Sequence, residues 1–317
     1  MLRNCSICKS SLSVETFYPR ERMLGFNEPF AFKTCQSCGC LQIMEPPSDP
    51  GKYYPSYYYS LTTSPYESPL KKRFRIGRDK FEFEKKGLPE GLIALIWPNK
   101  FLRLIGSLPS INRNSRILDV GCGYGQHLLM LEELGFKNLE GTDPYNKEVI
   151  RHRTFSIQKD ELKNLNGPYD LIMLHHVLEH LENQHETFQK IKNLLSENGL
   201  MLVAVPLSDS YARKSFGEEW VQWDPPRHHF LHTKESLKIL GENNGFELIS
   251  VMYDSSDFQF WGSKMYRRNN KLYDGVGNPE EKYKYFSALT IVWYKIRASL
   301  LNWQKKGDQA LFVFQKT

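Results

Sequence analysis

The segment HHVLEHLEN, which follows the apolar run DLIML, gathers side chains that can move protons or bind metal ions. It contains His175, His176, Glu179 and His180. Because His176 and His180 are four residues apart, a helix here would place both on one face together with Glu179. Such a face offers either a general base with an orienting carboxylate or three ligands for a divalent cation such as Mg or Mn. The alternative, in which Glu179 and His180 only cap and pack the helix, stays open.

A second group of chemically active side chains lies further on, in the segment EEWVQWDPPRHHFLHTKESL. Aromatic and basic groups at this density suit a sugar or nucleotide surface better than a core. We therefore expect His228 to join His176, Glu179 and His180 in a catalytic centre, with His180 or His228 as the base. The members of this second group are Trp220, Trp223, Arg227, His228 and His229.

A glycine-rich turn follows the strand-like run ILDV. The segment ILDVGCGYG contains Gly121, Gly123 and Gly125 and leads into the helix-forming HLLMLEEL. Glycines let the backbone turn tightly and approach a ligand at the N-terminus of a helix. The spacing departs from the dinucleotide fingerprint G-x-G-x-x-G, because the third glycine comes one residue early and position 126 is Gln.

Two carboxylates flank this turn. Asp119 stands two residues before the first glycine, and Asp143 closes the second strand in LEGTDP. A carboxylate at the end of that strand can accept hydrogen bonds from both hydroxyls of a ribose. Cys122 lies inside the turn, where a small side chain fits, and we interpret it as a packing residue rather than a nucleophile.

Five of the six cysteines lie between Cys5 and Cys40. The two C-x-x-C pairs, Cys5 with Cys8 and Cys35 with Cys38, can converge on one tetrahedral zinc ion with four thiolates. Four thiolates leave no open position, so the zinc would be structural. Cys40 is then a small buried residue. A redox dithiol is disfavoured, because that use needs one C-x-x-C beside a βαβ unit.

The elements that must position these residues follow from the alternation of apolar runs and amphipathic stretches after Ser115. Strand-like runs separated by amphipathic stretches predict a parallel sheet with crossover helices. Five such strands are followed by two late ones, with a polar and aromatic insertion over 254–308 that contains a helix near Ser287 to Gln304. The strand-like runs are RILDV, NLEGT, FSIQ, DLIML, LMLVAV, ELISVMY and QALFVFQK. We predict three regions: a zinc-ribbon module (1–48), a Tyr-, Pro- and Lys-rich connector with a helical segment (49–114), and the catalytic domain (115–317).

The acidic residue, the G-x-G-x-G turn and the second acidic residue resemble the first motifs of class I S-adenosylmethionine-dependent methyltransferases. The resemblance implies an α/β fold, with a Rossmann-like seven-stranded sheet and helices on both faces. It also implies that Asp119 faces the methionine portion of S-adenosylmethionine and that Asp160 contacts the adenine, with Gln158 or Glu161 as alternatives. The cofactor residues so implied are Asp119, Gly121, Gly123, Gly125, Asp143, Asp160 and His175.

The whole chain resembles one branch of that family. The shared features are an N-terminal zinc ribbon, a Tyr-Pro-Tyr-rich connector (YYPSYYY), an L-E-H segment after the fourth strand and a P-R-H segment after the fifth. Members are associated with methylation of hydroxyls on cell-surface glycans, which implies a lipid-linked, nucleotide-linked or polymeric sugar as substrate and a role in polysaccharide biosynthesis. The L-E-H and P-R-H pieces also resemble ubiquinone-pathway O-methyltransferases and small-RNA 2′-O-methyltransferases that hold a divalent ion. The RNA enzymes have Glu at the first of these positions, where this chain has His176.

Composition and charge bear on which partners and rival functions fit the chain. The chain has 317 residues and a formal net charge of +6, and the stretch 71–86 holds eight basic residues against three acidic ones. This stretch is either a solvated face or a surface for phosphates. RNA 2′-O-methylation is the first rival function and a catalytically silent binding module the second; nucleic acid is disfavoured, because it demands a longer basic and aromatic surface.

No apolar run reaches the roughly 20 residues that span a bilayer, and the first residues lack an apolar signal core. We expect a cytoplasmic protein, with peripheral contact to the inner face of the membrane as an option. The stretch 91–108 has apolar residues at helical spacing on both sides of Pro98, a predicted break. Core packing is the first interpretation of this stretch, and docking on a membrane surface is the second.

Overall fold

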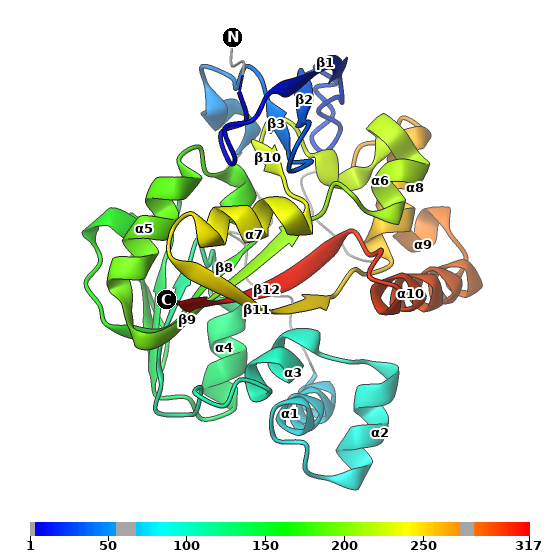
Figure 1. Ribbon diagram of the computed structural model, residues 1–317. Helices are drawn as coiled ribbons and strands as arrows, with labels where there is room; N and C mark the ends of the chain where they lie inside the picture. Colours follow the sequence, from blue (N-terminus) through cyan, green and yellow to red (C-terminus); the bar gives the residue numbers. More distant parts are fainter. Residues whose placement is uncertain (1–3, 55–67, 273–281) are drawn as a thin grey trace. The chain divides into compact units, whose positions relative to one another are not determined.

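The computed structural model describes residues 4–54, 68–272 and 282–317. Figure 1 labels the helices and strands along the chain. The chain forms two compact units, and each is interrupted in sequence. The first unit comprises 1–59, 176–188 and 204–312, and the second comprises 60–175, 189–203 and 313–317. The predicted boundaries after residues 48 and 114 stay predictions. Residues 55–59 of the YYPSYYY connector lie outside the described part of the chain.

The second unit is built on a sheet with the strand order β12-β9-β8-β4-β5-β7-β6, in which β9 and β12 also extend into the first unit. Strand β4 pairs in parallel with β5 and β8, β5 pairs in parallel with β7, and β6 is antiparallel to β7. The strands are β4 (Arg116–Val120), β5 (Asn138–Thr142), β6 (Ile150–Arg151), β7 (Ser156–Gln158), β8 (Tyr169–His175), β9 (Leu195–Pro206) and β12 (Gln309–Lys316).

The parallel strands are continuous apolar runs because both of their faces are covered. Ile117 and Leu118 of β4 and the stretch 171–174 of β8 are fully buried. The strand order reverses at β4, whose neighbours are β5 and β8, and ligands of open α/β sheets bind at the carboxyl ends of strands at such a point. The predicted Rossmann-like sheet is confirmed. With β11 (Phe246–Tyr253), the neighbour of β12, it has eight strands, and β6 is the one beyond the seven expected.

Short helices complete the second unit. They are α1 (Pro69–Glu84), α2 (Leu88–Ile96), α3 (Lys100–Gly106) and α4 (Gln126–Glu133). The break predicted at Pro98 is confirmed between α2 and α3, and the apolar residues Leu102 and Ile105 of α3 are buried. Three of the six basic residues of α1 form ion pairs inside the unit: Lys72 and Arg75 pair with Glu133 at 3.2 and 2.8 Å, and Arg78 pairs with Asp79 at 2.6 Å. The other three, Lys71, Arg73 and Lys80, are exposed.

The first unit begins with a small antiparallel sheet in the order β1-β2-β3-β10. Its strands are β1 (Leu12–Phe17), β2 (Phe32–Cys35), β3 (Leu41–Ile43) and β10 (Phe230–Leu231). The remaining elements are α5 (Gln184–Leu194, which ends in the second unit), α6 (Tyr211–Phe216), α7 (Lys234–Glu242), β11 (Phe246–Tyr253), which lies next to β12, α8 (Phe258–Arg267), α9 (Lys282–Tyr285) and α10 (Ala288–Trp303). Helix α10 confirms the helix predicted near Ser287 to Gln304. Among the described residues, no helix has the length and apolar character to cross a membrane.

The two tryptophans of the second sequence group belong to the core of the first unit. Trp220 and Trp223 are fully buried among residues such as Phe32 and Phe260. Their indole N–H groups are satisfied internally, by Asp308 Oδ2 at 3.1 Å and by a backbone carbonyl at 2.8 Å. The expectation that these rings form a sugar or nucleotide surface is therefore wrong, because their large apolar area is used to build the core.

Candidate cofactor site and catalytic cluster

The glycine turn after β4 needs glycine at all three positions. Gly121, Gly123 and Gly125 have φ angles of 65°, 53° and 84°, in the left-handed region that side chains disfavour. A Cβ atom on Gly125 would also lie 2.8 Å from Cδ1 of Ile157. The backbone N–H of Gly121 donates to the carbonyl of Thr142 at 2.7 Å, so the turn is attached to the end of β5.

Cys122 packs under this turn. A Cβ atom on Gly141 of β5 would lie only 2.7 Å from the Cys122 sulfur, which shows how closely the thiol fills the space there. Burial raises the pKa of the Cys122 thiol, with a further contribution from the charges of Asp119 and Asp143. A protonated, half-buried thiol in close contact with β5 agrees with the interpretation of Cys122 as a packing residue.

Asp143 organises the turn from the end of β5. Its two oxygens accept hydrogen bonds from the backbone N–H groups of Gly123 at 2.8 Å and Tyr145 at 2.9 Å. Burial raises its pKa, although these two bonds act in the opposite direction. Each oxygen has a second lone pair with which it can accept a ligand hydroxyl. Asn146, which the sequence interpretation missed, donates to the carbonyl of Gly123 at 3.0 Å and braces the same turn.

Asp119, at the end of β4 in the second unit, has a buried carboxylate, and neither of its oxygens has a hydrogen-bond partner among the described residues. Burial and the nearby charge of Asp143 raise its pKa to about 8. Buried polar atoms are normally hydrogen-bonded, so an unpartnered carboxylate beside a ligand-binding turn fits a missing donor from a ligand. A cationic ammonium group would supply both the donor and the compensating charge.

Asp160 lies just after β7 and is bound within its own turn. Its Oδ1 atom accepts bonds from Glu161 N at 2.8 Å and from Asn164 Nδ2 at 2.5 Å. Its carbonyl accepts a bond from the Thr142 hydroxyl at 2.6 Å, which ties the turn to the end of β5. The assignment of Asp160, Gln158 or Glu161 to the adenine stays a prediction.

His175 ends β8, the parallel neighbour of β4. Its ring stacks on His127 of α4 with centroids 3.8 Å apart, and the Phe101 ring is nearly perpendicular to it with centroids 5.0 Å apart. His127 was missed in the sequence, where it reads only as part of an amphipathic helix. Asp119, Asp143, Asp160 and His175 all lie at or just after the carboxyl ends of parallel strands, as the predicted cofactor site requires.

The local structure around the first histidine group differs from the expected helix. His176 has φ of 52°, in the left-handed region, and only a 3-10 turn over Leu178–His180 follows it. Helix α5 begins at Gln184. A left-handed residue cannot continue into a right-handed helix, so His176 and Glu179 do not share a helical face with His180. The prediction of one common helical face is wrong.

The turn nevertheless brings the four predicted catalytic residues together in the first unit. His176 Nδ1 lies 3.1 Å from Glu179 Oε1, and His228 Nε2 lies 3.9 Å from the same oxygen. The rings of His180 and His228 have centroids 4.8 Å apart. Glu179, His180 and His228 each offer one ligand atom, and these three atoms lie within 4.8 Å of one another. We call these three residues the Glu–His–His cluster.

The hydrogen bonds of His180 and His228 show which ring nitrogen of each keeps a lone pair that can accept a proton or bind a cation. His180 Nδ1 lies 2.8 Å from the carbonyl of Arg227, and His228 Nδ1 lies 2.9 Å from the carbonyl of Gln222. Because a carbonyl can only accept, each Nδ1 carries the proton and each neutral ring keeps its lone pair on Nε2. Burial, together with the charge of His228, lowers the pKa of His180 to about 4, so this ring is neutral at pH 7.

Glu179 supplies a fixed negative charge beside these rings. Burial would raise its pKa, but the hydrogen bond from His176 and the charges of the surrounding histidines lower it to about 2. For His176, burial alone would lower the pKa. The hydrogen bond to Glu179 and the negative charge of that residue have a larger effect, so the pKa of His176 is raised. Glu179 Oε2 has no hydrogen-bond partner in the described ranges. A buried carboxylate with two Nε2 lone pairs can bind a divalent cation or orient a hydroxyl that is losing its proton.

A buried ion-pair network around Arg227 contacts the Glu–His–His cluster through His180. Arg227 is fully buried and pairs with Glu21 at 2.9 Å and with Asp224 at 2.5 Å. Because the carbonyl of Arg227 accepts the proton of His180, this network fixes the ring orientation of a cluster residue. Arg227 therefore acts inside the structure rather than on a sugar or nucleotide surface. Glu21 and Asp224 were not predicted, since nothing in the sequence places Glu21 near position 227.

The four cysteines of the C-x-x-C pairs converge. The sulfurs of Cys5 and Cys38 are 3.8 Å apart, those of Cys8 and Cys35 are 3.3 Å apart, and all four lie within 4.8 Å of one another. A tetrahedral zinc with Zn–S bonds of about 2.3 Å has sulfurs about 3.8 Å apart, so the residues fit that ion. The Cys40 thiol is outside this group, and its sulfur lies 4.0 Å from His232 Nδ1.

The cysteine module is connected to the Glu–His–His cluster through β10. Strand β3 pairs with β10, and the carbonyl of His229 accepts a bond from Ile43 N at 2.9 Å. The N–H of His229 donates to the carbonyl of Glu179 at 2.8 Å. The Thr233 hydroxyl, just beyond β10, donates to the carbonyl of Cys38 at 2.6 Å. The cysteine module therefore helps to hold the loop that carries His228.

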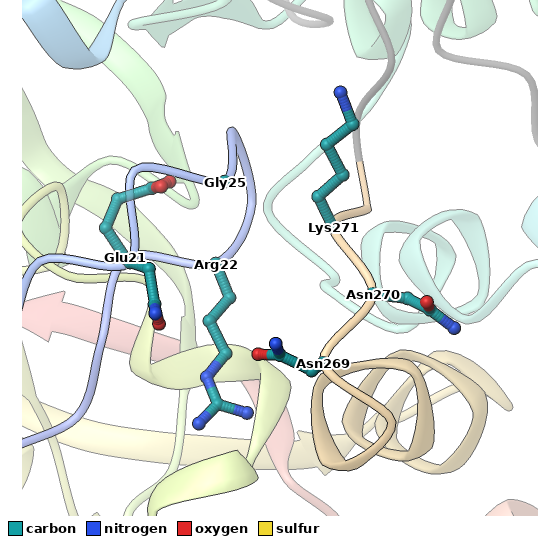
Figure 2. Close-up of a pocket in the computed structure, with 7 residues that line it drawn as sticks. Glu21, Arg22, Gly25, Asn269, Asn270 and Lys271 are labelled. Carbon is teal, nitrogen blue, oxygen red and sulfur yellow. The ribbon is translucent and has the colours of Figure 1, made fainter.

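A polar cavity of about 240 Å³ lies in the first unit (Figure 2). Figure 2 shows one wall carrying Glu21, Arg22 and Gly25 and the opposite wall carrying Asn269, Asn270 and Lys271. Glu21 belongs to both the cavity and the ion-pair network, because it lines the cavity and pairs with Arg227. Its charged and amide groups suit a small ligand rich in hydroxyls.

Comparison with known proteins agrees with the sheet order. Residues 96–251, just under half of the chain, match a family model described as a methyltransferase domain. The strand order and this match identify a class I S-adenosylmethionine-dependent methyltransferase domain within the chain.

Individual relatives are distant. The chain is 28% identical over 135 residues to the ubiquinone biosynthesis O-methyltransferase of Maricaulis maris, covering 37% of this chain and 52% of the relative. It is 27% identical over 126 residues to the tRNA U34 carboxymethyltransferase of Campylobacter fetus, covering 35% and 44%. The chain thus spans about half the length of the curated relatives it matches. Among solved structures, a mycolic acid cyclopropane synthase complexed with SAH and CTAB has a TM-score of 0.47 at 18% identity, covering 83% of this chain and 99% of that one.

Proposed function

We propose that this protein transfers a methyl group from S-adenosylmethionine to a hydroxyl of a sugar. The observation that carries the proposal is the Glu–His–His cluster: a buried carboxylate and two imidazoles with free Nε2 lone pairs, within one chain that also contains a methyltransferase domain. The cofactor supplies a methyl group already activated by its sulfonium leaving group. The protein must therefore mainly align the acceptor and remove its proton.

Different residues of the second unit would bind different parts of S-adenosylmethionine. Asp119 would accept hydrogen bonds from the ammonium of the methionine portion, which explains why its oxygens have no partner among the described residues. The glycine turn allows close approach of the ligand to the backbone, and the free lone pairs of Asp143 would accept the ribose hydroxyls. His175 and Asp160, at neighbouring strand ends, would complete the site.

The cluster would take the proton from the acceptor hydroxyl. A pKa of about 4 makes His180 a weak base, so His228 is the better candidate and His180 would accept a hydrogen bond or bind a cation. If Mg²⁺ or Mn²⁺ takes part, Glu179 Oε2 with Nε2 of His180 and His228 would hold it. His176 would act on Glu179, to which it is hydrogen-bonded, as a positioning residue.

The acceptor is assigned to sugars for two reasons besides the resemblance of the motifs. The polar cavity lined by Glu21, Arg22 and Asn269 is smaller than the roughly 300–1,000 Å³ typical of drug-sized ligands, so it suits a single sugar ring. Half of the basic residues of α1 pair with acidic residues of its own unit, which reduces the positive surface that this helix could offer to RNA. The named tRNA-modifying relatives make RNA the alternative acceptor.

Zinc is proposed as a structural ion of the cysteine module. Cys5, Cys8, Cys35 and Cys38 would all bind as thiolates, leaving no open position. Such a site needs reduced cysteines, which supports a reducing compartment such as the cytoplasm.

The test measures transfer of labelled methyl groups from S-adenosylmethionine to nucleotide-sugars, lipid-linked sugars, glycan fragments and tRNA. We expect transfer to a sugar hydroxyl by the wild type and a loss of about 100- to 10,000-fold in His228→Ala. His229→Ala is the matched control, since His229 contributes its backbone to the structure and should keep its activity. Transfer to tRNA and to no sugar would replace the proposal with the RNA alternative.

A further inference from the structure

Helix α10 has two apolar faces on opposite sides. One face is buried in the core of the first unit, where the Tyr294 ring lies 5.4 Å from Phe260 and 6.0 Å from Phe286. The residues of this face are Ile291, Tyr294, Ala298, Leu301 and Asn302. A single buried face is enough to hold a surface helix, so the second apolar face has no role in this packing.

The second face is open to solvent. Leu289 and Trp303 are 82% and 81% exposed, and the other members are about half exposed. At about 100° per residue the six side chains fall within an arc of about 100°, and no polar residue lies inside it. We call this the outer face of α10; it consists of Leu289, Val292, Trp293, Ile296, Leu300 and Trp303. Contiguous exposed apolar surface of this kind marks an interaction site.

The chain segment that carries the outer face has charges of one sign only. The sequence from Lys282 to Lys306 has six basic residues and no acidic residue. Lys295 lies on one flank of the helix, and Lys305 and Lys306 follow its end; all three are exposed. At the other end the exposed rings of Tyr283 and Tyr285 precede the helix.

We propose that the outer face of α10 docks on the surface of an anionic lipid bilayer. Tryptophan and leucine on one face with lysine at the margins is the pattern of helices that lie in the plane of a membrane interface, and tyrosine and tryptophan favour the headgroup level. The positive rim complements anionic lipid and opposes docking of a second copy of the same positively charged face. The inference rests on α10 alone and does not depend on the chemistry of the Glu–His–His cluster.

The test is flotation of the full-length protein with vesicles of phosphatidylcholine containing 30% phosphatidylglycerol, and with phosphatidylcholine alone. We expect the wild type to float with the anionic vesicles, with a partition that falls on addition of salt. Leu300→Asp should lower this partition at least tenfold. Replacing Lys305 and Lys306 by Gln should lower it by roughly fivefold for each residue. Val14→Asp is the matched control, because Val14 is 91% exposed in β1 and lies in the same unit.

Thermal unfolding of each variant separates loss of docking from loss of folding. If Leu300→Asp does not fold, Trp303→Ser replaces it, since that side chain is 81% exposed. Absence of flotation with the wild type, or equal flotation of wild type and folded outer-face variants, would overturn the proposal. Light scattering that shows a wild-type dimer dissociated by Leu300→Asp, without vesicle binding, would assign the face to a second copy instead.

Discussion

Replacing Asp119 by Asn should stabilise the ligand-free protein while weakening its affinity for S-adenosylmethionine. Asp119 is buried without a hydrogen-bond partner among the described residues, and burial with the charge of Asp143 raises its pKa from 3.8 to about 8. In the folded protein, Asp119 must therefore either stay charged where a charge is poorly solvated or bind a proton. At neutral pH both cost free energy of folding. Asparagine removes that requirement with almost no change in shape.

The direction and size of the expected stability change follow from the difference in protons bound by the folded and unfolded states. Between about pH 4 and pH 8 the folded state binds one more proton at Asp119 than the unfolded state, so the free energy of unfolding decreases as pH rises through this window. The slope is about 1.4 kcal/mol per pH unit. The stability difference between Asp119→Asn and the wild type should therefore widen by about 4 kcal/mol between pH 5 and pH 8. Above the folded pKa the difference becomes constant.

The assay is denaturant unfolding of ligand-free wild type and variant at several pH values in this range. Glu197→Gln is the control, because Glu197 is exposed in β9 of the same unit and has no place in the proposed site. Its difference from the wild type should stay nearly constant with pH. The same preparations are titrated with S-adenosylmethionine by calorimetry, where Asp119→Asn should bind at least tenfold more weakly, since a charge-assisted bond contributes about 1.5–3 kcal/mol.

The two measurements fail in distinguishable ways. A pH-independent stability difference would show that the Asp119 carboxylate is solvated, and the inference from its burial would be refuted. A variant that gains stability but keeps its affinity would show that the orphaned carboxylate serves something other than the cofactor.

Three further predictions concern the other parts of the site. Asp143→Ala should weaken binding of the demethylated cofactor by roughly ten- to a hundredfold, because Asp143 also holds the N–H of Gly123, and unchanged affinity by calorimetry would exclude Asp143 from the site. Elemental analysis should find one zinc ion per chain, and Cys35→Ser should lower both zinc content and the thermal midpoint; a folded wild-type module without zinc would refute the four-thiolate site. His180→Ala and His228→Ala should reduce turnover with little change in cofactor affinity, and near-normal rates in both would place the base elsewhere. Loss of activity with a chelator, restored by Mg²⁺ or Mn²⁺, would select the metal-assisted form of the mechanism.

Local patterns were sufficient for much of the fold. The run RILDV followed by alternate glycines predicted β4 and its turn, because left-handed backbone at three alternate positions leaves glycine as the favoured residue. The C-x-x-C spacing predicted the convergence of four cysteines, since two tight turns can each present two sulfurs to one ion. The break at Pro98 also follows from the chemistry of a single residue.

The sequence by itself therefore determined the class of fold, the cofactor turn and the cysteine pairs, all of which depend on short-range geometry. Only the tertiary structure decided what surrounds the histidines of the candidate site. The left-handed backbone at His176 replaced the expected helix, and burial converted Trp220 and Trp223 from expected surface rings into core. The pairing of Arg227 with Glu21, 206 residues apart, has no local signal. Burial and long-range ion pairing depend on which segments meet in space, and these contacts set the pKa values and ring orientations on which the proposed chemistry depends.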